Sequence, residues 1–436
     1  VGTPAEASVA YRYDASGNRT KEIDERHTEE APTVRNSFDA LNRLVSASNG
    51  EGETTLCGYD AEGNRTSVQE PKGSTTRFTY GERGELLTVT EPAPAEGEVA
   101  AVTTYAYDPS RNRTSQRDAN GALVEMGYDE LNRVTSRVQD AAAGGLNLLT
   151  LLEYDENGNE TLLTDPRDQT VTNTYDELDR LETTSYAFAD GETEIPWRHT
   201  TGLTYRYDEN DNLVQVDESV ASGLDPPART LTTTRSYDDL DRLESETTTL
   251  PDDATRTVSY AYFDNGTRRS VTDPDGVTTT YTYDGKNRLA TATTDSETPQ
   301  AKTTTYAYFP DDLLRSVTSP NGVVATHAYD LANRLTSLVN TWTSATVSSN
   351  AYTYDDHGNR ITQVEANGGL TETTTYAYDA LDRLAGVTYP VDSDYPSGRE
   401  VRYAYDAVGN RVGETTTLPG QPDQVLANKR GIFDSL

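Results

Sequence analysis

A short turn signature recurs along almost the whole chain, and it limits the possible folds more than any other feature. An aromatic residue begins each of its 17 copies, which are 20 to 32 residues apart. These aromatic residues are Tyr13, Phe38, Tyr59, Tyr80, Tyr107, Tyr128, Tyr154, Tyr175, Tyr207, Tyr237, Phe263, Tyr283, Phe309, Tyr329, Tyr354, Tyr378 and Tyr405. Such self-similarity indicates an array in which each unit packs only on its neighbours.

The turns are of two kinds that alternate. One reads D-x-x-G-N-R, as in "YDASGNR" (13–19), and the other reads D-x-L-D/N-R-L, as in "YDELDRL" (175–181). Asp can bond the backbone beyond it, and Gly and Asn tolerate positive φ. The residues expected to build the turns are Tyr13, Asp14, Gly17, Asn18, Arg19, Tyr59, Asp60, Gly63, Asn64, Arg65, Tyr175, Asp176, Arg180, Tyr283, Asp284, Asn287, Arg288, Tyr378, Asp379, Arg383, Tyr405, Asp406, Gly409, Asn410 and Arg411.

The turn arginines are expected to have a structural role. Arg19, Arg65, Arg180 and Arg288 are each well placed to bond the carboxylate of their own turn or to stack on a neighbouring Tyr. We therefore predict an Asp–Arg clamp in these turns.

Between the turns, the residues alternate as in half-buried strands. In "TDPDGVTTTYTYDGKNRLATAT" (272–293), Asp273 to Gly276 fits a type I turn, and Val277, Thr279, Tyr281 and Tyr283 share one face of the following segment. The spacing predicts strands of about five to eight residues joined as an antiparallel meander. Tyr-x-Tyr pairs precede many turns, and we expect their rings to stack in rows across neighbouring hairpins.

Composition excludes several functions. The formal charge is −35, whereas a nucleic-acid reader needs a basic patch. No run of about 18 apolar residues could span a bilayer. The acidic, lysine-poor balance is typical of a salt-loving host, although an acidic surface also keeps a large β-sheet protein soluble.

No catalytic or metal motif is evident. His27, His199, His327 and His357 form no i, i+4 pair, and Cys57 cannot form an internal disulfide. We predict no enzymatic activity, no cofactor and no metal. Acidic turns such as "DENGNE" (155–160), "DENDN" (208–212) and "DPDG" (273–276) are better explained as Asx-turns than as calcium loops, and the turn consensus by itself produces N-glycosylation matches such as Asn18-Arg19-Thr20.

Two tryptophans lie in longer insertions. Trp197 is in "EIPWRHT" and Trp342 is in "NTWTSAT". An exposed aromatic insertion can bind sugars or partners, but we expect these side chains to fill the concave face of the sheet.

The segment "FDNGTRRSVTDPDGVTTTYTYDGKNRLATAT" (263–293) resembles the RHS/YD repeat of bacterial Rhs and wall-associated polymorphic toxins, toxin-complex C components and teneurins. The resemblance covers residues 11–411, with 1–10 as an N-terminal lead-in. The remaining segment, 412–436, is a tail that does not match the RHS core of the toxins, so no autoprotease residues are carried over. The N-terminus reads like a cut inside a longer protein.

The resemblance implies an all-β RHS/YD-repeat array, a long antiparallel meander of hairpins that spirals into a curved sheet, barrel or hollow shell. It also implies a non-catalytic scaffold, secreted or at the cell surface, that encloses or presents a toxin or effector cargo. Its partners would be an enclosed effector domain or further RHS repeats of the same polypeptide, with neither nucleic acid nor membrane insertion. The alternative is an extracellular adhesion or fibre protein, possibly glycan-binding, that self-associates through its open sheet edges.

Overall fold

The regular structure of the described chain consists of β-strands. The computed structural model describes residues 9–24, 27–30, 32–95, 97–142, 144–187, 199–221, 229–250, 254–294, 301–391 and 394–427. It has 35 strands, from 4 residues in β1 to 10 in β29. The described chain contains no helix, and therefore none that is long and apolar enough to cross a membrane.

The strands divide between two compact units. Unit 1 comprises 1–107, 116–121 and 304–436, and unit 2 comprises 108–115 and 122–303. The early strands of unit 1 are β1 (Ala10–Tyr13), β2 (Arg19–Ile23), β3 (Val34–Phe38), β4 (Leu44–Asn49), β5 (Thr54–Tyr59), β6 (Arg65–Gln69), β7 (Thr75–Tyr80), β8 (Leu86–Thr90) and β9 (Val102–Tyr107). Its late strands are β26 (Leu314–Thr318), β27 (Val324–Tyr329), β28 (Leu335–Trp342), β29 (Ala345–Tyr354), β30 (Arg360–Asn367), β31 (Leu370–Tyr378), β32 (Leu384–Tyr389), β33 (Arg399–Tyr405), β34 (Arg411–Thr417) and β35 (Gln424–Ala427).

Unit 2 holds the middle of the chain. Its strands are β11 (Leu123–Tyr128), β12 (Val134–Gln139), β13 (Leu148–Tyr154), β14 (Glu160–Thr164), β15 (Thr170–Tyr175), β16 (Leu181–Ala187), β17 (His199–Tyr207), β18 (Leu213–Ala221), β19 (Arg229–Tyr237), β20 (Leu243–Thr249), β21 (Thr255–Tyr262), β22 (Arg268–Thr272), β23 (Thr278–Tyr283) and β24 (Leu289–Thr294). Strands β10 (Arg113–Arg117) and β25 (Lys302–Tyr308) contribute residues to both units.

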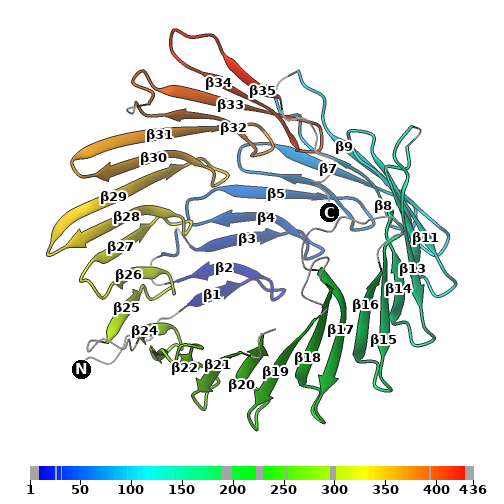
Figure 1. Ribbon diagram of the computed structural model, residues 1–436. Coiled ribbons are helices and arrows are strands. Elements are labelled where there is room, and N and C mark those ends of the chain that lie inside the picture. Colours follow the sequence, from blue (N-terminus) through cyan, green and yellow to red (C-terminus); the bar gives the residue numbers. More distant parts are fainter. Residues whose placement is uncertain are drawn as a thin grey trace. The chain divides into compact units, whose positions relative to one another are not determined.

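The connectivity is the predicted meander. Within each unit, successive strands pair antiparallel, as β3 does with β4 and β4 with β5 in unit 1, and β13 with β14 in unit 2 (Figure 1). The 17 signature turns close the odd-to-even hairpins, from β1–β2 to β33–β34. We call this end of the hairpins the YD-turn end. The even-to-odd loops, which include the Pro turns at 70–74, 165–169, 273–277 and 319–323, form the other end, the Pro-turn end.

Both kinds of signature turn share one backbone geometry. In the turn 39–43, the Asp39 amide bonds the Arg43 carbonyl at 3.0 Å, and the Asn42 amide bonds the Asp39 carbonyl at 3.0 Å. The fourth residue has positive φ, 60° at Asn42 and 95° at Gly63, and the strand register shifts by one residue beside the turn. This is a type I turn with a bulge, which favours Gly, Asn or Asp at the fourth position. Among the signature turns that the structure describes, the exception is Arg111, with φ of 71°.

Two of the predicted copies are shifted by one residue. At Phe263 and Phe309, the turn bonds show that the Phe itself occupies the position of the Asp, so the preceding Tyr262 and Tyr308 are the signature aromatics. Each Phe packs edge-to-face on the Tyr of the next hairpin, with centroids 6.2 Å apart for both Phe263–Tyr283 and Phe309–Tyr329. The reading from sequence was wrong at 263 because Phe263-Asp264 resembles the signature pair, and at 309 because a second aromatic residue directly follows Tyr308.

The expected rows of directly stacked tyrosine rings are not how the hairpins are joined. In many hairpins the signature Tyr instead donates its hydroxyl to a carbonyl of the preceding hairpin, as from Tyr59 to Leu44 at 2.9 Å and from Tyr283 to Arg268 at 2.9 Å. An Arg guanidinium lies over many of the rings, for example Arg43 over Tyr59 at 4.7 Å from its centroid. The tyrosine rows therefore depend on hydroxyls and guanidinium groups, which explains why Tyr is preferred over Phe.

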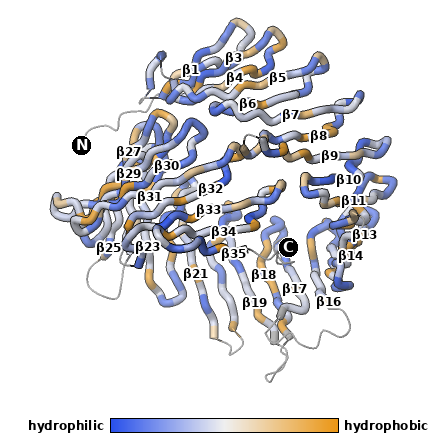
Figure 2. Tube along the Cα trace, turned by 90° about the horizontal axis from the view of Figure 1, so that it is seen from above, coloured by the Kyte–Doolittle hydropathy of each residue, from blue (hydrophilic) through white to orange (hydrophobic). Residues whose placement is uncertain are grey.

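The interior is thin. Among the described residues none is less than 2% exposed as a whole residue, and the buried apolar residues are Ile23, Ala101, Val220, Val387 and Val401. Figure 2 shows hydrophilic and hydrophobic residues interspersed along the strands. The fold is thus stabilised by many small repeated contacts.

Candidate functional site: the turn ends and the seam of unit 1

The D-x-L-D/N-R turns contain the predicted Asp–Arg contact. Arg180 Nε donates to Asp176 Oδ2 at 2.8 Å, and the same bond is 2.8 Å in Arg288–Asp284 and 2.7 Å in Arg383–Asp379. Arg383 also donates to the Asp406 carbonyl of the next turn at 3.1 Å and lies over the Tyr405 ring. One guanidinium therefore closes its own turn and holds the next hairpin.

In the D-x-x-G-N-R turns, Asn replaces Arg in the clamp, so the predicted Asp contact is wrong for Arg19 and Arg65. Asn18 Nδ2 donates to Asp14 Oδ2 at 2.9 Å, and Asn64 bonds Asp60 in the same way. The hydrogen bond from Asn18 lowers the pKa of Asp14 below its usual value. Arg19 lies one residue beyond the turn, where it pairs with Glu22 and stacks on Tyr11, as predicted for a neighbouring ring.

The alternation of the two kinds has a structural reason. The Asn of the first kind bonds the fourth residue of the next turn, as from Asn18 to Asn42 at 2.8 Å and from Asn159 to Asp179 at 2.9 Å. The Arg of the second kind bonds the first carbonyl of the turn after it. Each kind therefore supplies a different link along the YD-turn end.

The other predicted turn residues lie where the repeat requires. Tyr175, Tyr378 and Tyr405 each donate their hydroxyl to the preceding hairpin. Gly17 and Gly409 have φ of 86° and 91°, and Asn287 has φ of 61°. Asn410 bonds Asp406, and Arg411 stacks on Tyr403 and pairs with Glu414. Tyr13 is 60% exposed in the first strand.

Unit 1 contains a contact that the repeat pattern does not predict. The Pro-turn end of its early hairpins meets the YD-turn end of its late hairpins (Figure 1). Residues about 280 to 310 positions apart in sequence bond there: 280 for Leu331–Glu51 and 310 for Lys72–Asp382. We call this contact the seam.

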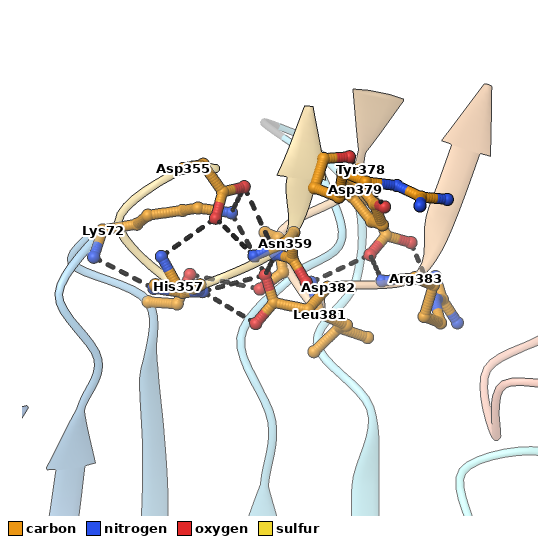
Figure 3. A network of polar contacts seen from close by, with 12 residues as sticks. Lys72, Asp355, His357, Asn359, Tyr378, Asp379, Leu381, Asp382 and Arg383 are labelled. Atoms are coloured by element: carbon orange, nitrogen blue, oxygen red, sulfur yellow. Dashed lines mark hydrogen bonds and ion pairs between the residues drawn. The ribbon is translucent and has the colours of Figure 1, made fainter. Parts of the chain in front are cut away.

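Lys72 forms the central ionic contact of the seam (Figure 3). Its Nζ lies 2.6 Å from Asp355 Oδ2 and 3.1 Å from Asp382 Oδ1, on two successive late turns. The Lys72 amide donates to His357 Nε2 at 3.0 Å, so this nitrogen is the acceptor and His357 Nδ1 donates to Asp382 at 2.7 Å. Ser74 Oγ donates to the Ala380 carbonyl at 3.1 Å.

These contacts shift the ionisation of the groups involved. Burial tends to raise the pKa of Asp382, but hydrogen bonds from His357, Asn359 and Lys72 together hold that pKa below its usual value. Burial likewise tends to raise the pKa of Asp355, but the hydrogen bonds from Lys72 and from the turn lower this pKa below its usual value. Burial tends to lower the pKa of Lys72, yet its two carboxylate partners raise it. The charged forms of all three groups therefore stabilise the seam.

A second contact lies one hairpin earlier. His27, whose side chain is buried, bonds the Leu331 carbonyl through Nε2 at 2.7 Å and faces Asp24 through Nδ1. Glu51 accepts the Leu331 amide at 2.8 Å, and Gly50 lies so close that a Cβ there would be 2.0 Å from the Leu331 oxygen. The backbone approach therefore requires Gly at position 50.

Two open hollows accompany the seam. One of about 410 Å³ is lined by Glu53, Glu70, Asp356, Asp382 and His357 among others. In the part of the chain that the structure describes, no group of three or more acidic, His or Cys residues is arranged to hold a metal ion. The acidic turns 155–160, 208–212 and 273–276 use their first Asp to bond their own amides.

Sequence reasoning missed the seam residues and misplaced a tryptophan. His27, Lys72 and His357 have ordinary local sequences, and only the meeting of distant hairpins reveals their role. Trp342 does not fill a concave face, since it is 56% exposed at the tip of β28 beside a turn whose Thr343 and Ser344 both have positive φ. Trp197 lies outside the described residues. His199 begins β17, His327 lies in β27, and Cys57 is partly buried in β5.

Comparisons with known proteins agree with this geometry. The RHS Repeat family model matches residues 38–75, 59–96, 262–300, 310–346 and 354–393. The crystal structure of TcdB2-TccC3 aligns with a TM-score of 0.70 at 14% identity, covering 97% of this chain and 26% of that chain. The Photorhabdus luminescens Tc holotoxin pore aligns with a TM-score of 0.70 at 14% identity, covering 97% and 25%. This chain therefore spans about a quarter of the length of those proteins, and no curated protein matches its sequence.

Proposed function

Because the chain belongs to the RHS/YD-repeat family, we propose that it is a non-catalytic scaffold, a section of the wall of an RHS shell that encloses or presents an effector cargo. The seam carries this proposal. A meander alone makes a ribbon one hairpin wide. The seam bonds at Lys72 and His27 join the Pro-turn end of the early hairpins to the YD-turn end of the late hairpins, which makes a wider wall. A containing wall needs such lateral closure, because a gap between layers would admit protease.

The cargo, the further repeats and the site of action belong to the same proposal. The matched structures are far longer than this chain, and one of them is the Photorhabdus luminescens Tc holotoxin pore. By analogy, the partner is an effector or further RHS repeats of the same polypeptide, in a secreted or cell-surface protein. The many repeated small contacts suit a rigid partition, and the turns use their polar groups for structure.

The test is protection of the cargo from protease. The complete reading frame that contains this chain would be expressed and digested with a non-specific protease. We expect any enclosed segment to survive in the wild type and to be cut faster in the Gly50→Ala variant, whose seam is opened at Leu331, while Gly285→Ala behaves as the wild type. Equal digestion of all three would contradict containment.

One observation favours adhesion as the second candidate. Trp342 and Leu370 are 56% and 61% exposed at the tips of the neighbouring hairpins β28–β29 and β30–β31. Exposed aromatic side chains bind sugar faces and partner surfaces. Glycan-array binding that disappears in Trp342→Ala would support this function, and absence of binding would remove it.

A further inference from the structure

The signature turn leaves one backbone donor unused. In the turn 39–43, the amides of Asp39, Leu41, Asn42 and Arg43 all bond within the turn. Only the second residue, Ala40, has an amide without a partner in the turn. The same arrangement holds in the turns at Asp176 and Asp238. A donor of this kind needs water or another molecule as its acceptor.

At the seam this donor is used repeatedly. The second-position amides of Leu331, Ala380 and Ala407 donate to three acceptors of the early hairpins. These acceptors are Glu51 Oε1 at 2.8 Å, the Pro94 carbonyl at 3.0 Å and Asn120 Oδ1 at 3.1 Å. Three late turns thus dock through the same turn position, whereas the turn 355–359 between them docks through His357 and Asp355.

Some turns at the opposite end of the hairpins lack this donor. Four of its turns have Pro at the second position, namely Pro71, Pro166, Pro274 and Pro320. Pro fits this position and has no amide hydrogen. These four turns therefore bring no second-position donor to a contact, although other groups of the Pro-turn end do donate at the seam, as from the Lys72 amide to His357 Nε2 at 3.0 Å and from Ser74 Oγ to the Ala380 carbonyl at 3.1 Å.

Apolar contact follows the same division. The third-position leucines Leu41, Leu131, Leu178 and Leu240 are 67%, 67%, 68% and 66% exposed. Their equivalent at the seam, Leu381, is partly buried in a hollow lined also by Ser74 and Pro92. Isolated exposed leucines are common on protein surfaces. Leu381 is covered where its turn is docked, whereas Val408, the equivalent residue of the docked turn 406–410, is 40% exposed.

We propose that the bare YD turns of unit 2 at 129–133, 176–180 and 238–242 are a docking surface for another run of RHS hairpins, presented by its Pro-turn end. Each turn would offer its second-position amide and its Leu, as the late turns of unit 1 do. Pro109 and Pro310 lack the amide, so their turns should not dock in this way. The inference is independent of whether the wall encloses a cargo.

The test uses a second copy of the full chain as the probe. Runs joined in one polypeptide meet at an effective concentration on the order of millimolar, so association should be measured up to that concentration. Because the chain carries a charge of −35, sedimentation should be run in about 1 M salt, where the Debye length is about 3 Å, as well as in low salt. We expect self-association in high salt, with the Glu177 and Asp239 amides becoming protected from hydrogen exchange.

Two variants separate docking from folding. Leu131→Asp/Leu178→Asp/Leu240→Asp should weaken association at least tenfold, while Leu149→Asp, on an exposed strand position, should not. Glu177→Pro/Asp239→Pro should weaken it by a similar factor while leaving thermal stability unchanged or raised, because Pro suits the turn. A wild type that stays monomeric in both salts, or variants that associate as the wild type does, would overturn the proposal.

Discussion

At the scale of single residues, Gly50 shows how a distant contact constrains one position. It occupies the second position of its turn, as Gly285 does, and neither has positive φ. A Cβ at position 285 would meet nothing within 4 Å, whereas at position 50 it would meet backbone at 2.0 Å. The requirement for Gly at position 50 therefore comes from Leu331 and not from the turn.

Gly50→Ala should open this part of the seam. The bonds of Leu331 to His27 and Glu51 would be lost, at about 0.5–1.5 kcal/mol each. Hydrogen exchange should show loss of protection at the Leu331 amide. Gly285→Ala is the matched control and should be neutral or slightly stabilising. Retained protection in Gly50→Ala would contradict the close approach.

The contribution of Lys72 should depend on pH in a defined direction. Asp355 and Asp382 have lowered pKa values, so their contribution is present above the unfolded Asp pKa of about 3.9 and is lost as the pH falls through the folded values. Lys72 has a raised pKa, so its contribution is present below about 10.4 and is lost as the pH rises through the folded value. Between these limits the pairing is complete.

Lys72→Met should therefore lower the free energy of unfolding by about 1–2 kcal/mol at neutral pH. Urea unfolding of this variant and of the wild type should give a constant difference from about pH 5 to pH 9, declining towards both extremes. Lys302→Met, at the exposed start of β25, should show no such profile. A difference that does not change with pH would argue against the ion pairs.

At the scale of elements, the two tyrosines of a pair have different tasks. The Tyr283 hydroxyl donates to the Arg268 carbonyl of the preceding hairpin, whereas no hydrogen bond from the Tyr281 hydroxyl occurs in the described structure. The ring positions could be predicted from the period of two. The hydroxyl contact could not, since it depends on which carbonyl the neighbouring hairpin presents.

Tyr283→Phe should lower the free energy of unfolding by about 0.5–1.5 kcal/mol, because the carbonyl loses its partner. Tyr281→Phe is the control from the same strand and should have little effect. Chemical denaturation of both variants measures the difference. Equal effects would mean that ring packing alone joins the hairpins.

At the scale of the whole molecule, net charge opposes compactness. The charge of −35 is distributed over a chain with few buried residues. Its self-repulsion is long-ranged, whereas the Asp–Arg clamps act at contact distance and are screened less. Added salt should therefore stabilise the fold, because it weakens the repulsion between like charges more than it weakens the Asp–Arg pairs.

The thermal midpoint should accordingly rise between about 0.01 M and 1 M sodium chloride, over which the Debye length falls from about 30 Å to 3 Å. Differential scanning calorimetry measures this rise. At pH 4.4, the isoelectric point expected from the sequence, the net charge is close to zero, so the thermal midpoint should rise much less with salt. A midpoint that falls with salt at neutral pH would show that ion pairs dominate.

The sequence by itself determined the all-β meander, the turn positions and most of the clamp residues, because these depend on groups within a few residues of one another. It misplaced Phe263 and Phe309 by one residue and assigned Arg19 and Arg65 a bond that Asn18 and Asn64 make, since only the turn's hydrogen bonds define its register. Tertiary structure alone decided the seam. Lys72 and Asp382 are 310 residues apart, and their contact depends on the path of every intervening hairpin, which no local period encodes.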